Sequence, residues 1–256
     1  MAGIRTVRCG SWAEFRRDLF GELFGGEAFE EDTYLFRGMG NDEWHLESSF
    51  DRQAHDIPSD ERDGHASELL DLFADECIAS DGGVNPCPAE LHPRIALAQH
   101  HGLPTRALDW TESPYVASHF AFAGAWGFGQ ADERGRVAIW ALDRNHPAWD
   151  PKHVEIVTTG RAGNERMIRQ HAALTYLHAP EATLEEYVGP RPETGDALVK
   201  FSLPKSEARV ALSDLSAMGI TSTRLFPDRE GAARAAKLRF AMRRAARDAW
   251  THGVGR

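Results

Sequence analysis

Cysteine is scarce in this chain of 256 residues, which contains only Cys9, Cys77 and Cys87 and no Cys-x-x-Cys pair. An odd number of cysteines at irregular spacing argues against a disulfide framework and against a thiolate zinc site. Long hydrophobic runs are missing as well. The longest, at residues 115–128, is interrupted by polar residues and glycines and is too mixed to cross a membrane. Because the first residues also carry no apolar signal segment, we expect a soluble cytoplasmic protein without a membrane partner.

Several sequence motifs of known enzyme classes are also absent. The chain has neither a Gly-x-x-x-x-Gly-Lys-Ser/Thr loop nor a Gly-x-Ser-x-Gly elbow, so P-loop NTPases and α/β-hydrolases have no motif support. The histidines His92, His100, His101 and His119 match no metalloprotease or deaminase signature, and no bound metal is expected. A nuclease would need a cluster of metal-binding carboxylates, and the sequence shows no clear one.

Basic residues are outnumbered, since 29 Lys and Arg face 39 Asp and Glu and the formal net charge is -10. This balance disfavours a nonspecific binder of polyanions. The C-terminal segment 229–247 is a local exception, because it is rich in arginine.

What is present is typical of a folded globular chain, with 42% hydrophobic and 27% charged residues. The hydrophobic spacing predicts an α+β fold, built as a single domain with a mixed or antiparallel sheet core flanked by helices. We expect an N-terminal helix within residues 1–30, a core at 33–228 and a basic amphipathic helix at 229–250. Further helices are predicted at 66–79, 89–101, 115–125 and 206–217, and strands at 33–36, 137–142, 154–157 and 198–203.

The most unusual run of residues is Gln-His-His-Gly-Leu-Pro-Thr-Arg-Ala-Leu-Asp-Trp-Thr at 99–111, directly before a helix that begins at Ser113. A helix N-terminus presents unpaired N–H groups and a partial positive charge, so Thr105, Arg106 and Thr111 beside it suit an anionic ligand such as a phosphate. The alternative from the residues alone is that Arg106 pairs with Asp109 and the neighbouring tryptophan belongs to the core.

A second candidate is Arg37, which follows the predicted strand at 33–36 and precedes Gly38. The glycine is expected to break the strand and to let the backbone turn or a ligand approach. The guanidinium of Arg37 is suited to grip a pyrophosphate or carboxylate with two hydrogen bonds, or to hold Asp109 as a structural tie.

A third group lies at residues 164–170, where Glu165 and Gln170 accompany two arginines. These side chains are suited to hydrogen-bond a ribose or the amide of nicotinamide. The alternative is a solvated helix face on which Glu165 pairs with Arg169.

Taken together, these segments resemble the FRG domain. The resemblance is carried by Phe36-Arg37-Gly38, by the run at 99–111 with the helix after it, by Arg-x-x-x-Gln at 166–170, and by Leu-Phe-Pro-Asp at 225–228. It implies that one FRG domain extends over nearly the whole chain, 1–256. The segment Gln-His-Ala-Ala-Leu at 170–174 departs from the Gln-Gly-Ala/Val-Phe that is more frequent in the family.

The chain is also similar, in the order of its elements, to ADP-ribosyltransferases, which place an arginine on an early strand, a Ser or Thr before an alanine-rich helix, and a Gln or Glu on a later strand. This similarity implies an ADP-ribosyltransferase-like fold with NAD as substrate. The implied catalytic residues are Arg37, Asp109, Glu165 and Gln170. The implied NAD-binding residues are Arg37, Gly38, His101, Thr105, Arg106, Trp110 and Thr111.

Two functions are therefore predicted from different classes. The first is an NAD-dependent ADP-ribosyltransferase or NAD glycohydrolase with a protein or nucleic-acid acceptor, which by analogy suits a bacterial toxin or defence effector. The oxocarbenium-like transition state of such a reaction needs a nearby carboxylate or amide dipole. The alternative is a non-enzymatic nucleic-acid or nucleotide-binding module, in which Arg37, Arg106, Trp110 and the basic C-terminal helix hold phosphates and stack bases.

Overall fold

The computed structural model describes residues 4–25, 30, 32–84, 86–126, 134–158, 170, 172–190 and 195–253. Its strands are β1 (Ile4–Arg8), β2 (Tyr34–Met39), β3 (Ala107–Thr111), β4 (Arg136–Asp143), β5 (Val154–Thr158), β6 (Ala172–Leu177) and β7 (Leu198–Pro204). Its α-helices are α1 (Trp12–Phe24), α2 (Arg62–Asp81), α3 (Leu91–His100), α4 (Pro114–Ala125), α6 (Leu184–Val188), α7 (Ala208–Ala217), α8 (Ser222–Leu225) and α9 (Arg229–Gly253). A short 3-10 turn, Lys205–Glu207, precedes α7.

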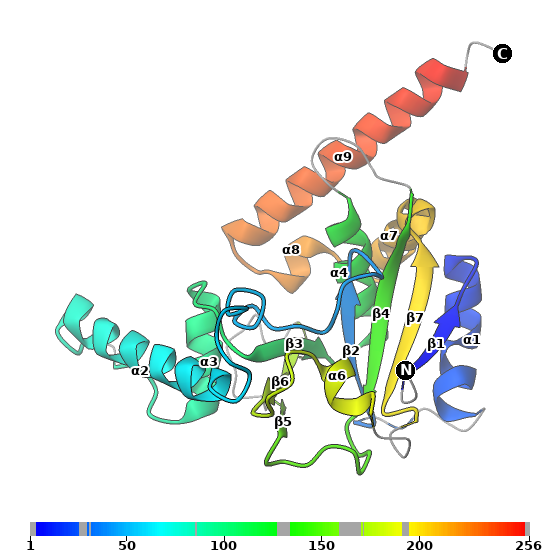
Figure 1. Cartoon of the computed structure of the whole chain (residues 1–256). Coiled ribbons are helices and arrows are strands. Elements are labelled where there is room, and N and C mark those ends of the chain that lie inside the picture. The colour runs from blue at the N-terminus through cyan, green and yellow to red at the C-terminus, as the bar shows by residue number, and fades with distance from the viewer. Residues whose placement is uncertain are drawn as a thin grey trace.

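The seven strands form one sheet in the order β1-β7-β4-β2-β3-β6-β5 (Figure 1). β1 runs parallel to β7, and the other neighbouring pairs are antiparallel. The predicted α+β class with a mixed sheet flanked by helices is therefore confirmed. β1 and β3 are additions to the predicted strands, since we expected the chain to open on a helix alone and predicted no strand at 107–111.

The sheet is buried on both faces, as β4 illustrates. Val137, Ile139 and Ala141 face one hydrophobic cluster, to which α1, α4 and α7 contribute. Ala138, Trp140 and Leu142 point to the other face and belong to a second cluster, which also contains residues of α6 and Trp149. Because successive side chains of a strand point to opposite faces, a continuous apolar strand is the expected sequence of such a two-sided core.

Two helix starts are capped by serine hydroxyls, at the predicted Ser113 and at Ser11 within the predicted N-terminal helix segment. The Ser11 hydroxyl accepts a hydrogen bond from the backbone N–H of Glu14 at the start of α1. The Ser113 hydroxyl likewise accepts from the N–H of Val116 at the start of α4, where Pro114 occupies the first helical position. Both serines satisfy backbone donors that the helix itself cannot pair.

The prediction that Gly38 breaks the strand is wrong, because β2 continues through Gly38 to Met39 in register with β4. The glycine serves the packing of α4 instead. A Cβ atom at position 38 would lie 1.8 Å from the carbonyl oxygen of Ala117, far inside any real contact. The side chain of residue 38 must therefore be hydrogen for α4 to lie this close to the sheet.

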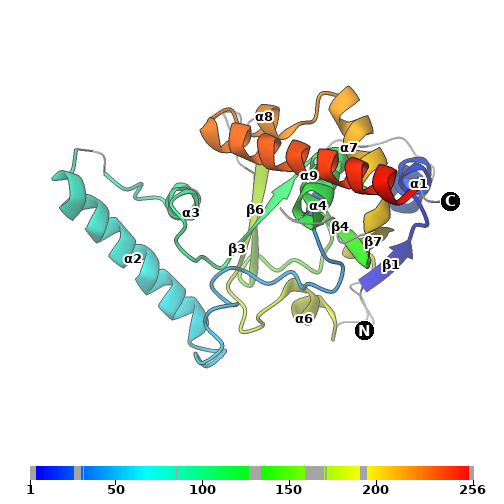
Figure 2. The same ribbon diagram turned by 90° about the horizontal axis from the view of Figure 1, so that it is seen from above.

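The sheet diverges between β2 and β3. These strands share the single register pair Phe36–Thr111, whereas β2 and β4 share six pairs and β3 and β6 share five. α2 and α3 lie beside the β3–β6 part, away from α1 and α7 (Figure 2). α9 passes over α4 in both views. Within the described ranges, none of the helices is both long and apolar enough to cross a membrane.

Candidate functional site

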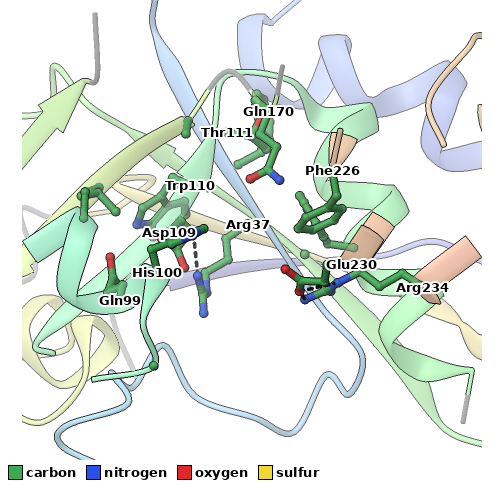
Figure 3. A pocket seen from close by; sticks show the side chains of 17 residues that line it. Arg37, Gln99, His100, Asp109, Trp110, Thr111, Gln170, Phe226, Glu230 and Arg234 are labelled. Atoms are coloured by element: carbon green, nitrogen blue, oxygen red, sulfur yellow. Dashed lines mark hydrogen bonds and ion pairs between the residues drawn. The ribbon is translucent and has the colours of Figure 1, made fainter. Parts of the chain in front are cut away.

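A cavity of about 500 Å³ opens where β2 and β3 diverge (Figure 3). Its size lies within the range of small-molecule sites. The polar residues that line it are Arg37, Gln99, His100, Asp109, Thr111, Gln170, Glu230 and Arg234. They come from β2, α3, β3, position 170 two residues before β6, and α9, so the wall combines segments that are distant in sequence.

Arg37 extends from β2 into the middle of this cavity (Figure 3). Its Nη1 donates a hydrogen bond of 2.5 Å to the backbone carbonyl of Asp109, and its buried Nε has no hydrogen-bond partner among the described residues. Burial lowers the pKa of Arg37, Arg52 lowers it further, and Asp109 opposes both. An arginine stays charged at neutral pH even so. A half-buried cation whose buried Nε is an unused donor is suited to bind an anionic ligand.

Asp109 lies on β3 beside Arg37, with an exposed side chain at the cavity wall. Arg37 donates to the backbone carbonyl of Asp109, so this hydrogen bond does not involve the Asp109 carboxylate. The alternative in which Asp109 pairs with Arg106 is wrong, because Arg106 pairs elsewhere. A carboxylate at this place is suited to stabilise positive charge that develops on a bound ligand.

Trp110 is a core residue that also lines the cavity. Its side chain packs in the cluster on the α6 side of the sheet, and its Nε1 donates to the Thr175 hydroxyl at 2.9 Å. The alternative that placed this tryptophan in the core is therefore confirmed. Its contact with a ligand is restricted to the part of the ring that reaches the cavity.

Thr111 and Gln170 meet at one end of the cavity (Figure 3). The Thr111 hydroxyl donates to the backbone carbonyl of Gln170 at 2.6 Å and accepts from the N–H of Ser113. The Gln170 Nε2 donates to the carbonyl of Leu225 at 3.1 Å. These hydrogen bonds join the ends of β3 and α8 to the start of β6. The pair is therefore held in place by backbone contacts on both sides.

The opposite wall comes from the C-terminal part of the chain. The Arg234 guanidinium lies 4.3 Å from the ring centre of Phe226 and pairs with Glu230 one helical turn earlier, at 2.5 Å. Figure 3 shows this group across the cavity from His100. Sequence reasoning did not assign Glu230 or Arg234 to the site, because an i,i+4 pair on an exposed helix is a common surface feature.

Thr105 and Arg106 do not line the cavity, and their predicted role as NAD ligands is wrong in this structure. The Arg106 side chain is fully buried and forms an ion pair with Asp51 at 3.1 Å. It also donates to the carbonyls of Ala179 and Glu181. Thr105 is buried as well; its backbone N–H donates to the Ser49 hydroxyl, and its carbonyl accepts from the N–H of Phe50. Both residues anchor the irregular segment after β2, since buried charges and backbone groups must be paired.

The remaining predicted site residues differ in whether they line the cavity. Gly38 lines the cavity, whereas His101 ends α3 with an exposed side chain and is replaced in the wall by its neighbour His100. Glu165 lies outside the described residues, as does its predicted partner Arg169. The N-terminus of α4 is also less open than predicted, because Thr111 and Ser113 already accept from its first N–H groups.

His119 is buried in α4, and its Nε2 lies 3.1 Å from the Ser222 hydroxyl. Burial lowers the pKa of His119 to about 4, with a smaller contribution from Arg234. The imidazole is therefore neutral at pH 7. Across the described ranges, no group of three or more His, Cys, Asp or Glu side chains is arranged to hold a metal ion.

Residues 32–127 match the family model described as the FRG domain. This match includes β2, β3 and α4, and thus Arg37, Asp109 and Thr111. The predicted extension of the domain to the C-terminal helix lies beyond the matched segment. No curated protein and no solved structure matches the chain.

Proposed function

Because the chain is an FRG-domain protein, we propose that it uses this domain as an NAD-dependent ADP-ribosyltransferase, with the cavity between β2 and β3 as the NAD site. Hydrolysis of NAD is the same reaction with water as acceptor. The proposal keeps the expected cytoplasmic setting and the expected role as a toxin or defence effector.

One observation carries the proposal. Arg37 on β2, Thr111 before the alanine-rich α4 and Gln170 before β6 are far apart in sequence, yet all three line the same cavity. Their order is the order of NAD-contacting elements that the sequence shares with ADP-ribosyltransferases. Convergence of such side chains in a cavity of this size is the expected geometry of a small-molecule site.

The binding roles follow from charge and shape. Arg37 supplies a half-buried cation for the pyrophosphate of NAD. The aromatic residues Trp110 and Phe226 supply apolar surface for a planar ring. The amide nitrogen of Gln170 donates to Leu225, and its amide oxygen accepts from a ribose hydroxyl or from the nicotinamide amide.

The chemical step breaks the bond between C1′ of the ribose and the nicotinamide nitrogen. Nicotinamide leaves with the bonding electron pair, and C1′ acquires oxocarbenium character. An oxygen or nitrogen nucleophile then forms the new bond to C1′ and loses its proton to solvent. The carboxylate of Asp109 stabilises the positive charge that develops at C1′. Glu165 remains a second predicted carboxylate for this role.

The direct experiment is to incubate the purified protein with NAD and to measure released nicotinamide by chromatography. Arg37→Ala removes the cation from the cavity, whereas Arg239→Ala removes an exposed arginine of α9 that does not line it. We expect release by the unmodified protein and by Arg239→Ala, and loss of release in Arg37→Ala. Circular dichroism establishes that each variant is folded.

Two outcomes would contradict the proposal. The first is absence of nicotinamide release by the unmodified protein, with and without cell lysate as a source of acceptor, together with no NAD-induced shift of the melting temperature. The second is equal release by Arg37→Ala and the unmodified protein, because the chemistry would then occur elsewhere.

A further inference from the structure

α9 reverses the charge balance of the chain. Seven of its 25 residues are Arg or Lys and two are Asp or Glu, although the whole chain carries a net charge of -10. The helix begins at the cavity wall, where Glu230 and Arg234 lie, and continues beyond the sheet (Figure 1). At a rise of 1.5 Å per residue, the distance from Arg234 to Arg247 is about 20 Å.

The two sides of α9 differ in what they contact. Leu238 and Met242 pack on the hydrophobic cluster to which α1, α4 and α7 contribute, and Ala241 between them is buried, with 7% exposed. On the opposite side, Arg243 and Arg244 are exposed. At residues 238–242 the apolar side of the helix is therefore turned to the protein's own core, whereas Arg243 and Arg244 face solvent.

An aromatic residue lies in the middle of the basic side. The Phe240 side chain is 51% exposed, although a phenylalanine would ordinarily be directed to the core side of such a helix. Lys237 precedes it by three residues, and Arg243 and Arg244 follow it by three and four, so all share its side of the helix. Cations around an exposed ring form a surface that pairs phosphates and stacks an unpaired base.

We propose that this surface, formed by Lys237, Phe240, Arg243, Arg244 and Arg247, binds a single-stranded nucleic acid and delivers it to the cavity as the ADP-ribosyl acceptor. The delivery part rests on the proposed function, whereas the binding part does not. An oxygen or nitrogen of the strand takes the place of water at C1′, and its proton passes to solvent.

Three features favour a single strand over other anionic partners. A duplex hides the faces of its bases, so an exposed ring gains no stacking from it. A membrane surface requires the apolar side of an amphipathic helix, and beside Phe240 that side is already packed on the core through Leu238 and Met242. An acidic protein segment satisfies the cations but provides no base to stack on Phe240.

Binding is tested without NAD, by fluorescence anisotropy with a labelled single-stranded oligonucleotide of about 16 nucleotides. The duplex of that sequence, polyglutamate and anionic lipid vesicles serve as competitors. The test variant replaces Lys237, Arg243 and Arg244 by alanine, and the matched control replaces Arg8, Lys152 and Arg209, which are exposed on other elements. Phe240→Ala tests stacking separately. Alanine favours the helix, so α9 is expected to remain folded.

We expect the unmodified protein and the control to bind the oligonucleotide with the same salt dependence. The logarithm of the binding constant falls linearly with the logarithm of the salt concentration, and each phosphate contact with a single strand contributes about 0.7 to that slope. The slope of the triple α9 variant should therefore be smaller by about 2. Between about 50 and 200 mM salt, the affinity of the unmodified protein then falls about 20-fold more than that of the variant. Phe240→Ala weakens binding at least about fivefold.

The proposal is overturned if polyglutamate, the duplex or the vesicles compete as well as the unlabelled single strand, or if the triple α9 variant and the control bind alike. Nicotinamide release in the absence of the oligonucleotide separates this result from the proposed function. Release with no oligonucleotide binding removes the nucleic-acid inference alone. Binding without release removes the transferase and leaves a binding surface.

Discussion

Replacement of Arg106 tests whether this arginine is structural or a ligand. Its side chain and that of Asp51 are fully buried, and its guanidinium also serves the carbonyls of Ala179 and Glu181. Arg106→Met retains an unbranched apolar side chain but leaves the Asp51 carboxylate with the Ser48 hydroxyl as its hydrogen-bond donor. Breaking a buried ion pair costs about 3–5 kcal/mol. Loss of the donors to two carbonyls adds about 1 kcal/mol or more.

We therefore expect Arg106→Met to lower the free energy of unfolding by at least about 4 kcal/mol, a large share of the total for a domain. Urea denaturation followed by tryptophan fluorescence measures this loss. The double variant Asp51→Leu/Arg106→Met replaces both charges by apolar groups. Its loss should be at least about 2 kcal/mol smaller than the summed losses of the two single variants, because neither charge is then buried alone.

Arg37→Met is the matched control, because Arg37 donates a hydrogen bond to the Asp109 carbonyl and faces the cavity. We expect it to cost less than about 1.5 kcal/mol of stability, the net value of one hydrogen bond. The structural assignment of Arg106 is refuted if Arg106→Met is no less stable than Arg37→Met. Additive losses in the double variant would refute the coupling of Arg106 to Asp51.

Three further predictions concern the packing, the pH dependence and the chemistry. Gly38→Ala should cost about 3 kcal/mol or more in urea denaturation because its Cβ meets the Ala117 carbonyl, whereas Gly21→Ala in α1, which meets nothing within 4 Å, should be neutral or stabilising. The pKa of His119, about 4, lies below its value of about 6.5 in the unfolded chain, so the unfolded chain binds more protons between these pH values. Stability should therefore fall as pH drops from about 6.5 to 4, by up to about 1.4 kcal/mol per unit, and His119→Gln should reduce that slope. Asp109→Asn should lower kcat for nicotinamide release about 100-fold with an unchanged melting temperature, and an unchanged kcat would exclude the carboxylate from the reaction.

Local sequence determined the elements whose formation depends on near neighbours. The caps at Ser11 and Ser113 were predictable because capping involves atoms three residues apart. The apolar run of β4 was predictable because alternation along a strand sets which core each side chain joins. β1 was not predicted, since a strand of five residues is assigned by its partner β7, nearly 200 residues later.

The sequence also marked the region of the site without distinguishing ligand from scaffold. Arg37 precedes a glycine and Arg106 follows a threonine. From residue type alone, both arginines were predicted to bind an anionic ligand. The structure separates them because the segment after β2 folds back and places Asp51 against Arg106, while Arg37 remains at the divergence of β2 and β3. Burial of a charge depends on what the rest of the chain packs around it.

The far wall of the cavity was decided by tertiary structure alone. Phe226, Glu230 and Arg234 lie more than 100 residues after Asp109 and face it only because α8 and α9 return across α4. Helix and strand periodicity report the neighbours of a residue within a few positions. The sequence by itself therefore determined the α+β class, the capped helices and the residues of β2 and β3 that could carry chemistry. The sheet divergence and the return of the C-terminal helices decided which of those residues share a cavity, because such contacts depend on the packing of the whole chain.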